Sequence, residues 1–229
     1  MISLEWKAPP TREVRVREPF DFCSRAKGGP ALFVGEGNLS FACSVAERAK
    51  HGTSIVATTH EAVDAITEAT KRNRAALHRL GANVLHGVNA TSLGERLQLG
   101  WHTIVFQFPN AGSRRSVHGG TANHHLIRRF LRSCRKVLSS DGSVAVSTVD
   151  SAYYHGVFDV PRAAEATGFA INAVHPFYRT QWDGYGHTNT LDVGSALRAS
   201  YRVCTWILSP HTTSSRPWPT LNVGRSRKA

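Results

Sequence analysis

The chain has 229 residues, of which 41% are hydrophobic, so it is long enough to form one domain with a full core. No apolar run approaches the length of about 20 residues that crosses a bilayer, and the first residues lack the charged-then-apolar order of a signal peptide. We therefore expect no membrane partner. The formal net charge of +12 favours nucleic acid as a partner, because each cation placed on a phosphate releases a counterion. A compositional bias toward arginine is the alternative.

The four cysteines are widely spaced in the sequence. Cys23, Cys43, Cys134 and Cys204 form no C-x-x-C pair, which argues against a zinc site. We expect reduced, mostly buried cysteines and no metal.

The sequence divides into three segments. Residues 1–30 are polar and basic and end in Lys27-Gly28-Gly29-Pro30, which breaks regular structure, so they are expected to form an N-terminal arm. Residues 31–209 form the predicted domain. Residues 210–229, rich in proline and basic side chains, are expected to be a flexible tail.

Strands and helices alternate through the predicted domain. Short apolar or β-branched runs predict strands at residues 31–35, 53–59, 83–87, 103–108, 143–149, 169–174 and 200–208. Apolar residues at helical spacing predict helices at 40–51, 61–80, 126–138 and 163–167. No clear helix separates the last two strands, which predicts that the last strand inserts antiparallel. The pattern indicates an α/β fold: a seven-stranded, mostly parallel, doubly wound Rossmann-like sheet that binds ligands at the carboxyl ends of its strands.

A glycine loop follows the first predicted strand in the segment LFVGEGNLSF. Gly35 and Gly37 permit close backbone approach to a ligand, and Asn38 and Ser40 mark a helix start. Ser40 stands where a dinucleotide fingerprint needs its third glycine. Glu36 would repel a pyrophosphate and attract a sulfonium or ammonium group, which favours S-adenosylmethionine over NAD. We expect all five residues to bind this cofactor, although an ordinary glycine turn would have the same local sequence.

The next two strands also end in polar residues. Glu61 follows the second strand, where a carboxylate can accept hydrogen bonds from both ribose hydroxyls. A carboxylate stabilised by a helix dipole is the alternative. Asn89 and Ala90 follow the third strand, where the cofactor's adenine would lie. Asn89 is equally suited to a turn or a helix cap.

The fourth strand ends in FQFPNAG, where methyl transfer would take place. Gln107 is expected to lie beside the acceptor, with Pro109 and Asn110 next to it as further catalytic residues. Phe108 lies between them and could stack on a base.

Five segments in this order resemble the motifs of the 25S ribosomal RNA (uridine-N3) methyltransferase-like domain: LFVGEGNLSF, ATTHE, HGVNAT, FQFPNAG and GYGHTNT. They extend over residues 31–190. The resemblance implies a class I S-adenosylmethionine-dependent fold and base methylation of RNA. The chain has Asn89 where the family has aspartate, Gln107 for asparagine, Asn110 for histidine, and Thr188 for arginine.

The resemblance also implies in-line transfer of a methyl group to a nitrogen, catalysed mainly by positioning and desolvation. Uridine N3 must lose a proton, and His187 or Asp183 could assist, although a structural histidine is the alternative. Trp182 and Tyr185, like Phe108, could stack on a base that has left its helix. Packing in the core is the alternative for each aromatic residue.

Three functions are compatible with these patterns. The motif order and the basic composition favour an RNA base methyltransferase with ribosomal RNA as its partner. A small-molecule methyltransferase and a non-catalytic RNA-binding relative are the alternatives. We expect a cytoplasmic protein, or a nucleolar one in a eukaryote; the sequence does not define an oligomeric state.

Overall fold

A computed structural model of the chain describes residues 15–113, 116–117, 120–150, 156–187 and 202–211. Residues 1–14 of the expected arm, most of the expected tail and Thr188 lie outside the described residues. In the part of the chain that is described, no helix is long and apolar enough to span a membrane.

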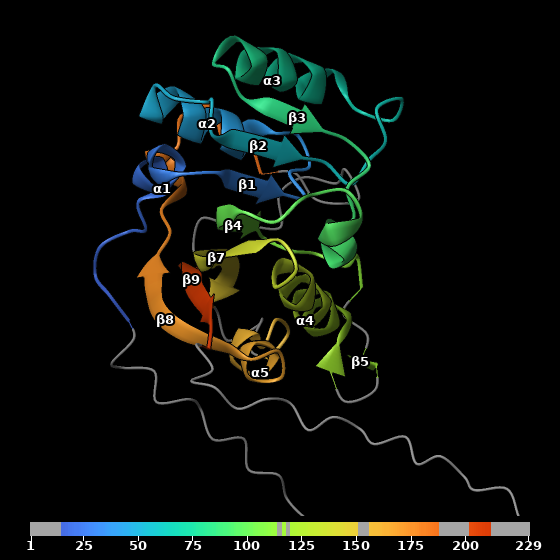
Figure 1. The fold of residues 1–229 in the computed structure, drawn as a ribbon, viewed down its shortest axis with the longest axis vertical. Helices are drawn as coiled ribbons and strands as arrows, with labels where there is room; N and C mark the ends of the chain where they lie inside the picture. The colour runs from blue at the N-terminus through green and yellow to red at the C-terminus, as the bar shows by residue number, and fades with distance from the viewer. Residues whose placement is uncertain (1–14, 114–115, 118–119, 151–155, 188–201, 212–229) are drawn as a thin grey trace, which may run out of the picture.

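A seven-stranded sheet with the order β3-β2-β1-β4-β7-β9-β8 forms the centre of the fold (Figure 1). Its strands are β1 (Ala31–Val34), β2 (Ile55–Thr58), β3 (Asn83–Leu85), β4 (Trp101–Gln107), β7 (Leu138–Asp150), β8 (Phe169–Pro176) and β9 (Arg202–Pro210). Strands β1, β2, β3, β4 and β7 pair in parallel. Strand β9 lies between β7 and β8 and is antiparallel to both. The predicted Rossmann-like sheet with an antiparallel last strand is therefore confirmed.

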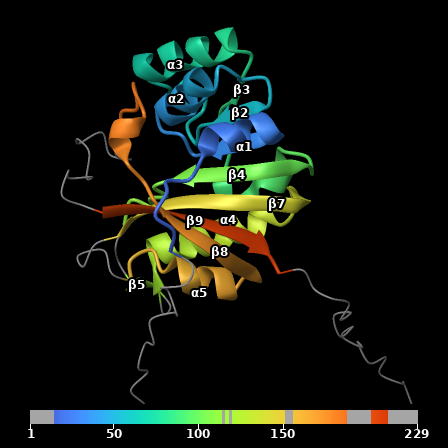
Figure 2. The ribbon, with the colours of Figure 1, turned by 90° about the vertical axis from the view of Figure 1, so that its left-hand side faces the viewer.

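Helices cover both faces of this sheet. They are α1 (Phe22–Gly28), α2 (Ser40–Ala49), α3 (Glu68–Arg79), the 3-10 helix η1 (Ala90–Glu95), α4 (Ala122–Cys134) and α5 (Val160–Glu165). Alternate residues of β1 point to opposite faces. Leu32 and Val34 join the core beneath η1, α4 and α5, whereas Phe33 joins the core beneath α1 and α2. Helices α3 and α5 lie at opposite ends of the molecule (Figure 2).

Part of the segment expected to be an arm belongs to the folded core. Asp21 caps α1 by accepting a hydrogen bond from the Ser24 backbone N–H at 2.9 Å. The Phe22 side chain is 2% exposed and meets Phe41 of α2 edge to face, with 5.1 Å between ring centroids. The packed part of the chain therefore begins before residue 31.

The helix expected at residues 61–80 is shorter than predicted. Helix α3 begins at Glu68, after the capping residue Thr67, whose hydroxyl accepts from the Thr70 backbone N–H. Ala62 and Ala65 match the helical spacing but are exposed in the preceding loop. Glu61 therefore does not lie at a helix N-terminus, which removes the dipole interpretation of its position.

Replacing Phe22 with alanine tests whether α1 is part of the domain. We expect Phe22→Ala to lower the free energy of unfolding by about 3–5 kcal/mol, because it leaves a cavity among buried aromatic rings. Lys27→Ala in the same helix is the control, with an expected change within about 0.5 kcal/mol because Lys27 is exposed. Urea denaturation measures both. Equal, small effects would mean that α1 contributes little to the core.

Candidate functional site

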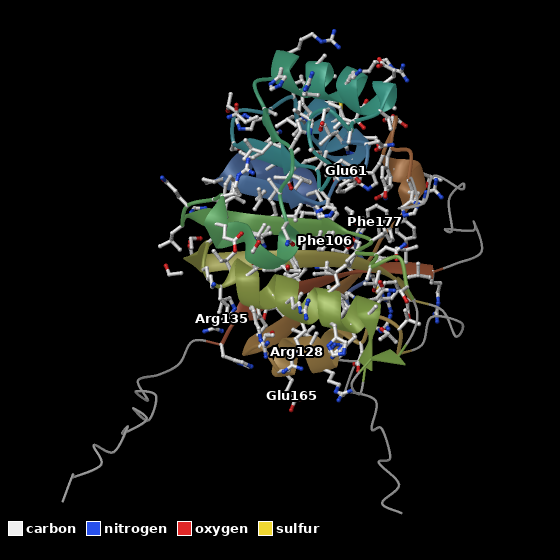
Figure 3. All side chains as sticks on the ribbon, turned by 90° about the vertical axis from the view of Figure 1, so that its right-hand side faces the viewer. Glu61, Phe106, Arg128, Arg135, Glu165 and Phe177 are labelled. Atoms are coloured by element: carbon white, nitrogen blue, oxygen red, sulfur yellow. The ribbon has the colours of Figure 1, made fainter. Side chains whose placement is uncertain are left out.

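A pocket of about 830 Å³ lies at the carboxyl ends of β1, β2, β3 and β4. The expected site residues that line it are Gly35, Glu36, Gly37, Asn38, Glu61, Asn89, Ala90, Gln107, Phe108, Pro109, Asn110, Tyr185 and His187. In Figure 3 the labelled Glu61 and Phe106, which line this pocket, lie between α3 and α4. The fold thus brings together motifs that are far apart in the sequence.

The glycine loop is fixed at the end of β1. Gly35 has a φ of 64°, and a Cβ atom there would lie 2.7 Å from the Phe106 ring. Glycine is therefore required by conformation and by space. The Gly35 backbone N–H donates to the Thr58 hydroxyl at 3.3 Å, and the Glu36 N–H donates to the Thr58 carbonyl at 2.8 Å. These bonds tie the loop to the end of β2.

Glu36 is a buried carboxyl group in the glycine loop that precedes α2. Its side chain is 6% exposed and accepts a hydrogen bond from the Ala42 backbone N–H at 3.1 Å. Burial raises the pKa of Glu36 to about 7, against the opposing effect of the backbone N–H groups of Ala42 and Phe41. A ligand cation in the pocket would favour the ionised form. The residue therefore fits the cationic cofactor that the sequence predicts.

Asn38 and Ser40 hold a second segment of the chain against the glycine loop. The Asn38 side-chain amide donates to the Gly186 carbonyl at 3.0 Å, and its oxygen accepts from the Ser40 N–H at 3.1 Å. The Ser40 hydroxyl accepts from the Gly186 N–H at 3.1 Å and donates to the Gly186 carbonyl at 3.2 Å. Ser40 does not line the pocket. Its side chain, like that of Asn38, positions the segment that carries Tyr185 and His187.

Glu61 and Asn89 lie on neighbouring loops of the pocket. The Glu61 carbonyl accepts from the Gly87 N–H at 2.8 Å, which fixes the backbone and leaves the exposed carboxylate beside the pocket. The Asn89 side-chain oxygen accepts from the Thr91 N–H at 2.9 Å and caps η1. The cap that the sequence allowed is therefore present. Because Oδ1 serves the cap, the group that Asn89 can offer a ligand is its Nδ2 donor.

The end of β4 forms the other half of the pocket. Both side-chain amide atoms of Gln107 are buried without a hydrogen-bond partner among the described residues. Phe108 has a φ of 51°, a left-handed conformation that is rare before a proline, and Pro109 follows it. Such unpaired and strained groups accumulate at functional sites. Gln107 and Phe108 therefore have the features that are common at functional sites, and they line the pocket.

Asn123 of α4 is a pocket residue that the sequence did not indicate. Its side-chain oxygen accepts from the Ala111 N–H at 2.7 Å and so holds the loop after β4. Asn110 forms a turn within that loop by accepting from the Gly112 N–H at 2.9 Å. Leu126 and Phe158 also line the pocket. No sequence motif predicts that these two residues line the pocket, because their position depends on the packing of α4 and α5.

His187 lies against the Phe108 ring, with 5.2 Å between ring centroids. Burial and, to a lesser extent, the Arg179 charge lower the pKa of His187 to about 4. The imidazole is therefore neutral at pH 7 and a weak base. This favours a packing and hydrogen-bonding role over the expected role in proton removal.

Two expected base-stacking residues differ in placement. Trp182 is 8% exposed and lies outside the pocket, edge to face with Phe41 at 5.1 Å and beneath the Arg48 guanidinium at 5.5 Å. It packs in the core because α1, α2 and the segment after β8 enclose it. Tyr185 lines the pocket, and burial, together with the nearby Glu36 charge, raises its pKa well above the ordinary value. Tyr185 therefore enters the pocket as a neutral phenol.

The sheet order and the pocket above its glycine loop define the Rossmann-like fold of class I methyltransferases. The chain belongs to the BMT5-like family, described as rRNA (uridine-N3-)-methyltransferase BTM5-like, whose model matches residues 32–189. The family resemblance seen in the five motifs is therefore confirmed.

Curated relatives cover different parts of the chain. A heavy metal-associated isoprenylated plant protein of Arabidopsis thaliana is 33% identical over 51% of this chain and 24% of its own length. The human ferredoxin-fold anticodon-binding domain-containing protein 1 is 29% identical over 67% of this chain and 27% of its own length. The chain thus spans about a quarter of the length of these two relatives.

Solved structures share the fold at low sequence identity. The glycopeptide N-methyltransferase MtfA, in complex with sinefungin, has a TM-score of 0.54 and 11% identity, over 83% of this chain and 91% of its own. TrmN from Thermus thermophilus has a TM-score of 0.50 and 16% identity, over 81% of this chain and 46% of its own. At these low identities, the similarities show that the chain shares the fold of these proteins.

Glu36→Gln tests the electrostatic state of the glycine loop. Glutamine keeps an acceptor for the Ala42 N–H and cannot ionise. Because the folded pKa of Glu36 is raised from 4.5 to about 7, wild-type stability is lost as pH rises through this range, by at most about 3 kcal/mol. We expect the variant to be more stable by about 1–3 kcal/mol near pH 8 and nearly unchanged near pH 4.5.

Urea denaturation of both proteins at these two pH values measures the difference. The other titratable groups are shared, so their contributions cancel in the comparison. An equal gain at both pH values would contradict a raised pKa as its cause.

Proposed function

We propose that the chain is an S-adenosylmethionine-dependent methyltransferase that methylates a base nitrogen in RNA, with uridine N3 of ribosomal RNA as the acceptor that the family suggests. The observation that carries this proposal is the two-part pocket. Cofactor-type loops from β1, β2 and β3 meet the unpaired amide of Gln107 from β4 in one cavity. Such an enzyme would act in the cytoplasm or, in a eukaryote, in the nucleolus.

The cofactor half of the pocket fits S-adenosylmethionine by its donors and charge. When bound, this cofactor supplies an electrophilic methyl group on a sulfonium. Gly35 and Gly37 let its methionine part approach the backbone, and Glu36 offers a carboxylate to its positive charge. Glu61 is placed to accept from the ribose hydroxyls. Similar folds have been solved with S-adenosylmethionine, S-adenosylhomocysteine or sinefungin bound, which supports the assignment.

The acceptor half would position a base by hydrogen bonds and ring contacts. The Gln107 amide has an adjacent donor and acceptor, which can pair with a base edge that also has one of each. Phe108 and Tyr185 flank this position as aromatic surfaces. A base must leave its helix to enter such a pocket. We assign His187 a positioning role here, because its low pKa makes it a poor proton acceptor.

Methyl transfer to RNA tests the proposal directly. The protein is incubated with tritium-labelled S-adenosylmethionine and total RNA from a strain that lacks it, and the modified nucleoside is identified by mass spectrometry. We expect the modified nucleoside to be 3-methyluridine.

The variant Glu61→Gln tests the cofactor half of the pocket. We expect it to weaken cofactor binding about tenfold or more, since it removes hydrogen bonds to a charged group worth about 1.5–3 kcal/mol. Calorimetry measures this affinity.

The other outcomes separate the alternatives. Label that enters a small-molecule extract but not RNA would indicate a small-molecule methyltransferase. A chain that binds RNA but no cofactor would be a non-catalytic relative. Because the Glu61 carboxylate is exposed, its replacement should leave the unfolding free energy unchanged, which controls for misfolding.

Gln107→Leu tests two roles of the unpaired amide separately: its effect on the stability of the ligand-free protein and its effect on methyl transfer. Leucine removes two buried polar atoms that lack partners, so we expect the ligand-free protein to gain about 1–3 kcal/mol in stability. Methyl transfer should fall by more than tenfold with cofactor affinity unchanged. Thermal denaturation, calorimetry and the tritium assay measure the three effects. Loss of stability would show that the amide has partners in the folded chain.

A further inference from the structure

The outer side of α4 carries a row of positive charge. Arg129, Arg132 and Lys136 are exposed and follow one another at helical spacing along this helix and its end. At 1.5 Å per residue they extend over about 10 Å. We call these three residues the basic ridge. Helix α4 itself has no acidic residue.

The basic ridge forms no ion pair with another residue in the part of the protein that the structure describes. Two ion pairs in the described part of the chain join Arg15 to Asp150 and Lys71 to Glu68, and neither contains a ridge residue. Arg135 differs from the ridge, because its guanidinium donates to the Gly168 carbonyl at 3.0 Å and lies over the Phe169 ring. Arg135 therefore fastens α4 to the end of α5, whereas the ridge faces solvent.

One stretch of sequence builds the ridge and part of the acceptor half of the pocket. Between Glu95 and Asp141 the chain has no acidic residue. This stretch contains β4, the loop after it and α4. A phosphate that approaches the acceptor half along α4 therefore meets no carboxylate from this stretch.

The ridge begins one helical turn from the pocket. Asn123 and Leu126 of α4 line the pocket, and Arg129 follows Leu126 after about 4.5 Å along the helix axis. In Figure 3, α4 lies across the near face of the molecule, and its labelled Arg128 and Arg135 lie toward α5. A nucleic-acid strand that leaves the pocket beside Leu126 and follows α4 would therefore reach the ridge within one helical turn.

We propose that the basic ridge binds the phosphates of the RNA strand whose base enters the pocket. This inference rests on the proposed function and names the surface that the RNA follows. The target base must be unstacked, so the nucleotides beside it form a flexible single strand that can follow α4. Each cation on a phosphate releases a counterion, so the ridge supplies affinity without reading sequence.

Paired charge-removing variants test the position of this surface. Arg129→Gln with Arg132→Gln removes two ridge charges. Arg72→Gln with Arg79→Gln removes two exposed charges from α3, which lies at the top of Figure 1, well separated from α4. Binding of a fluorescein-labelled single-stranded RNA is measured by anisotropy between about 50 and 200 mM salt. We expect the ridge variant to lose affinity about tenfold and its salt slope to fall by about 1.4, and the α3 variant to change little.

Each remaining result has a distinct meaning. Equal losses in the two variants would overturn the ridge as the RNA surface while leaving the proposed function intact. If the wild-type protein binds no RNA, both the ridge and the RNA part of the proposed function fail. Both variants should bind S-adenosylmethionine with unchanged affinity, because neither pair lines the pocket. A ridge variant that loses cofactor binding as well would overturn the inference, because its RNA defect would then reflect a damaged pocket.

Discussion

The contact between Gly35 and the Phe106 ring is the constraint on which the site depends. Strands β1 and β4 run in parallel with Val34 opposite Phe106, so both strands end at the same edge of the sheet. The Phe106 ring occupies the space of a side chain at Gly35 and lies edge to face with Phe130 of α4, 4.9 Å away. The Phe106 ring therefore packs between the glycine loop and α4, at the end of the strand that leads to Gln107.

Much of the fold could be predicted from the sequence because strand and helix periodicities are local properties. The antiparallel last strand followed from the absence of a crossover helix, since parallel neighbours require one. Helix α1 could not be predicted, because it has few apolar residues and is stabilised by contacts with distant parts of the chain. Its Phe22 packs against Phe41 and Trp182. Ala62 and Ala65 misled the helix prediction in the opposite direction, because small residues match a helical spacing whether or not they are buried.

The position of the site was easier to predict than the orientation of its side chains. Motifs after successive parallel strands must meet at one edge, so the lining of the pocket followed from their order. The partners of Asn38 and Ser40 did not, because both bond to Gly186, which is far away in the sequence. The low pKa of His187 likewise results mainly from burial in the folded chain, which no local motif reveals.

Charge is distributed between the pocket and the surface in a way that fits the two proposed ligands. Inside, the groups that are hardest to stabilise are a buried carboxyl, Glu36, and an unpaired neutral amide, Gln107. Outside, α4, which lines part of the pocket, carries the basic ridge. A cation inside the pocket would relieve the cost of ionising Glu36, whereas a polyanion would be repelled by that carboxylate and attracted by the ridge. The same electrostatics would therefore draw the cofactor inward and keep the RNA backbone on the surface, so that only an uncharged base enters beside Gln107.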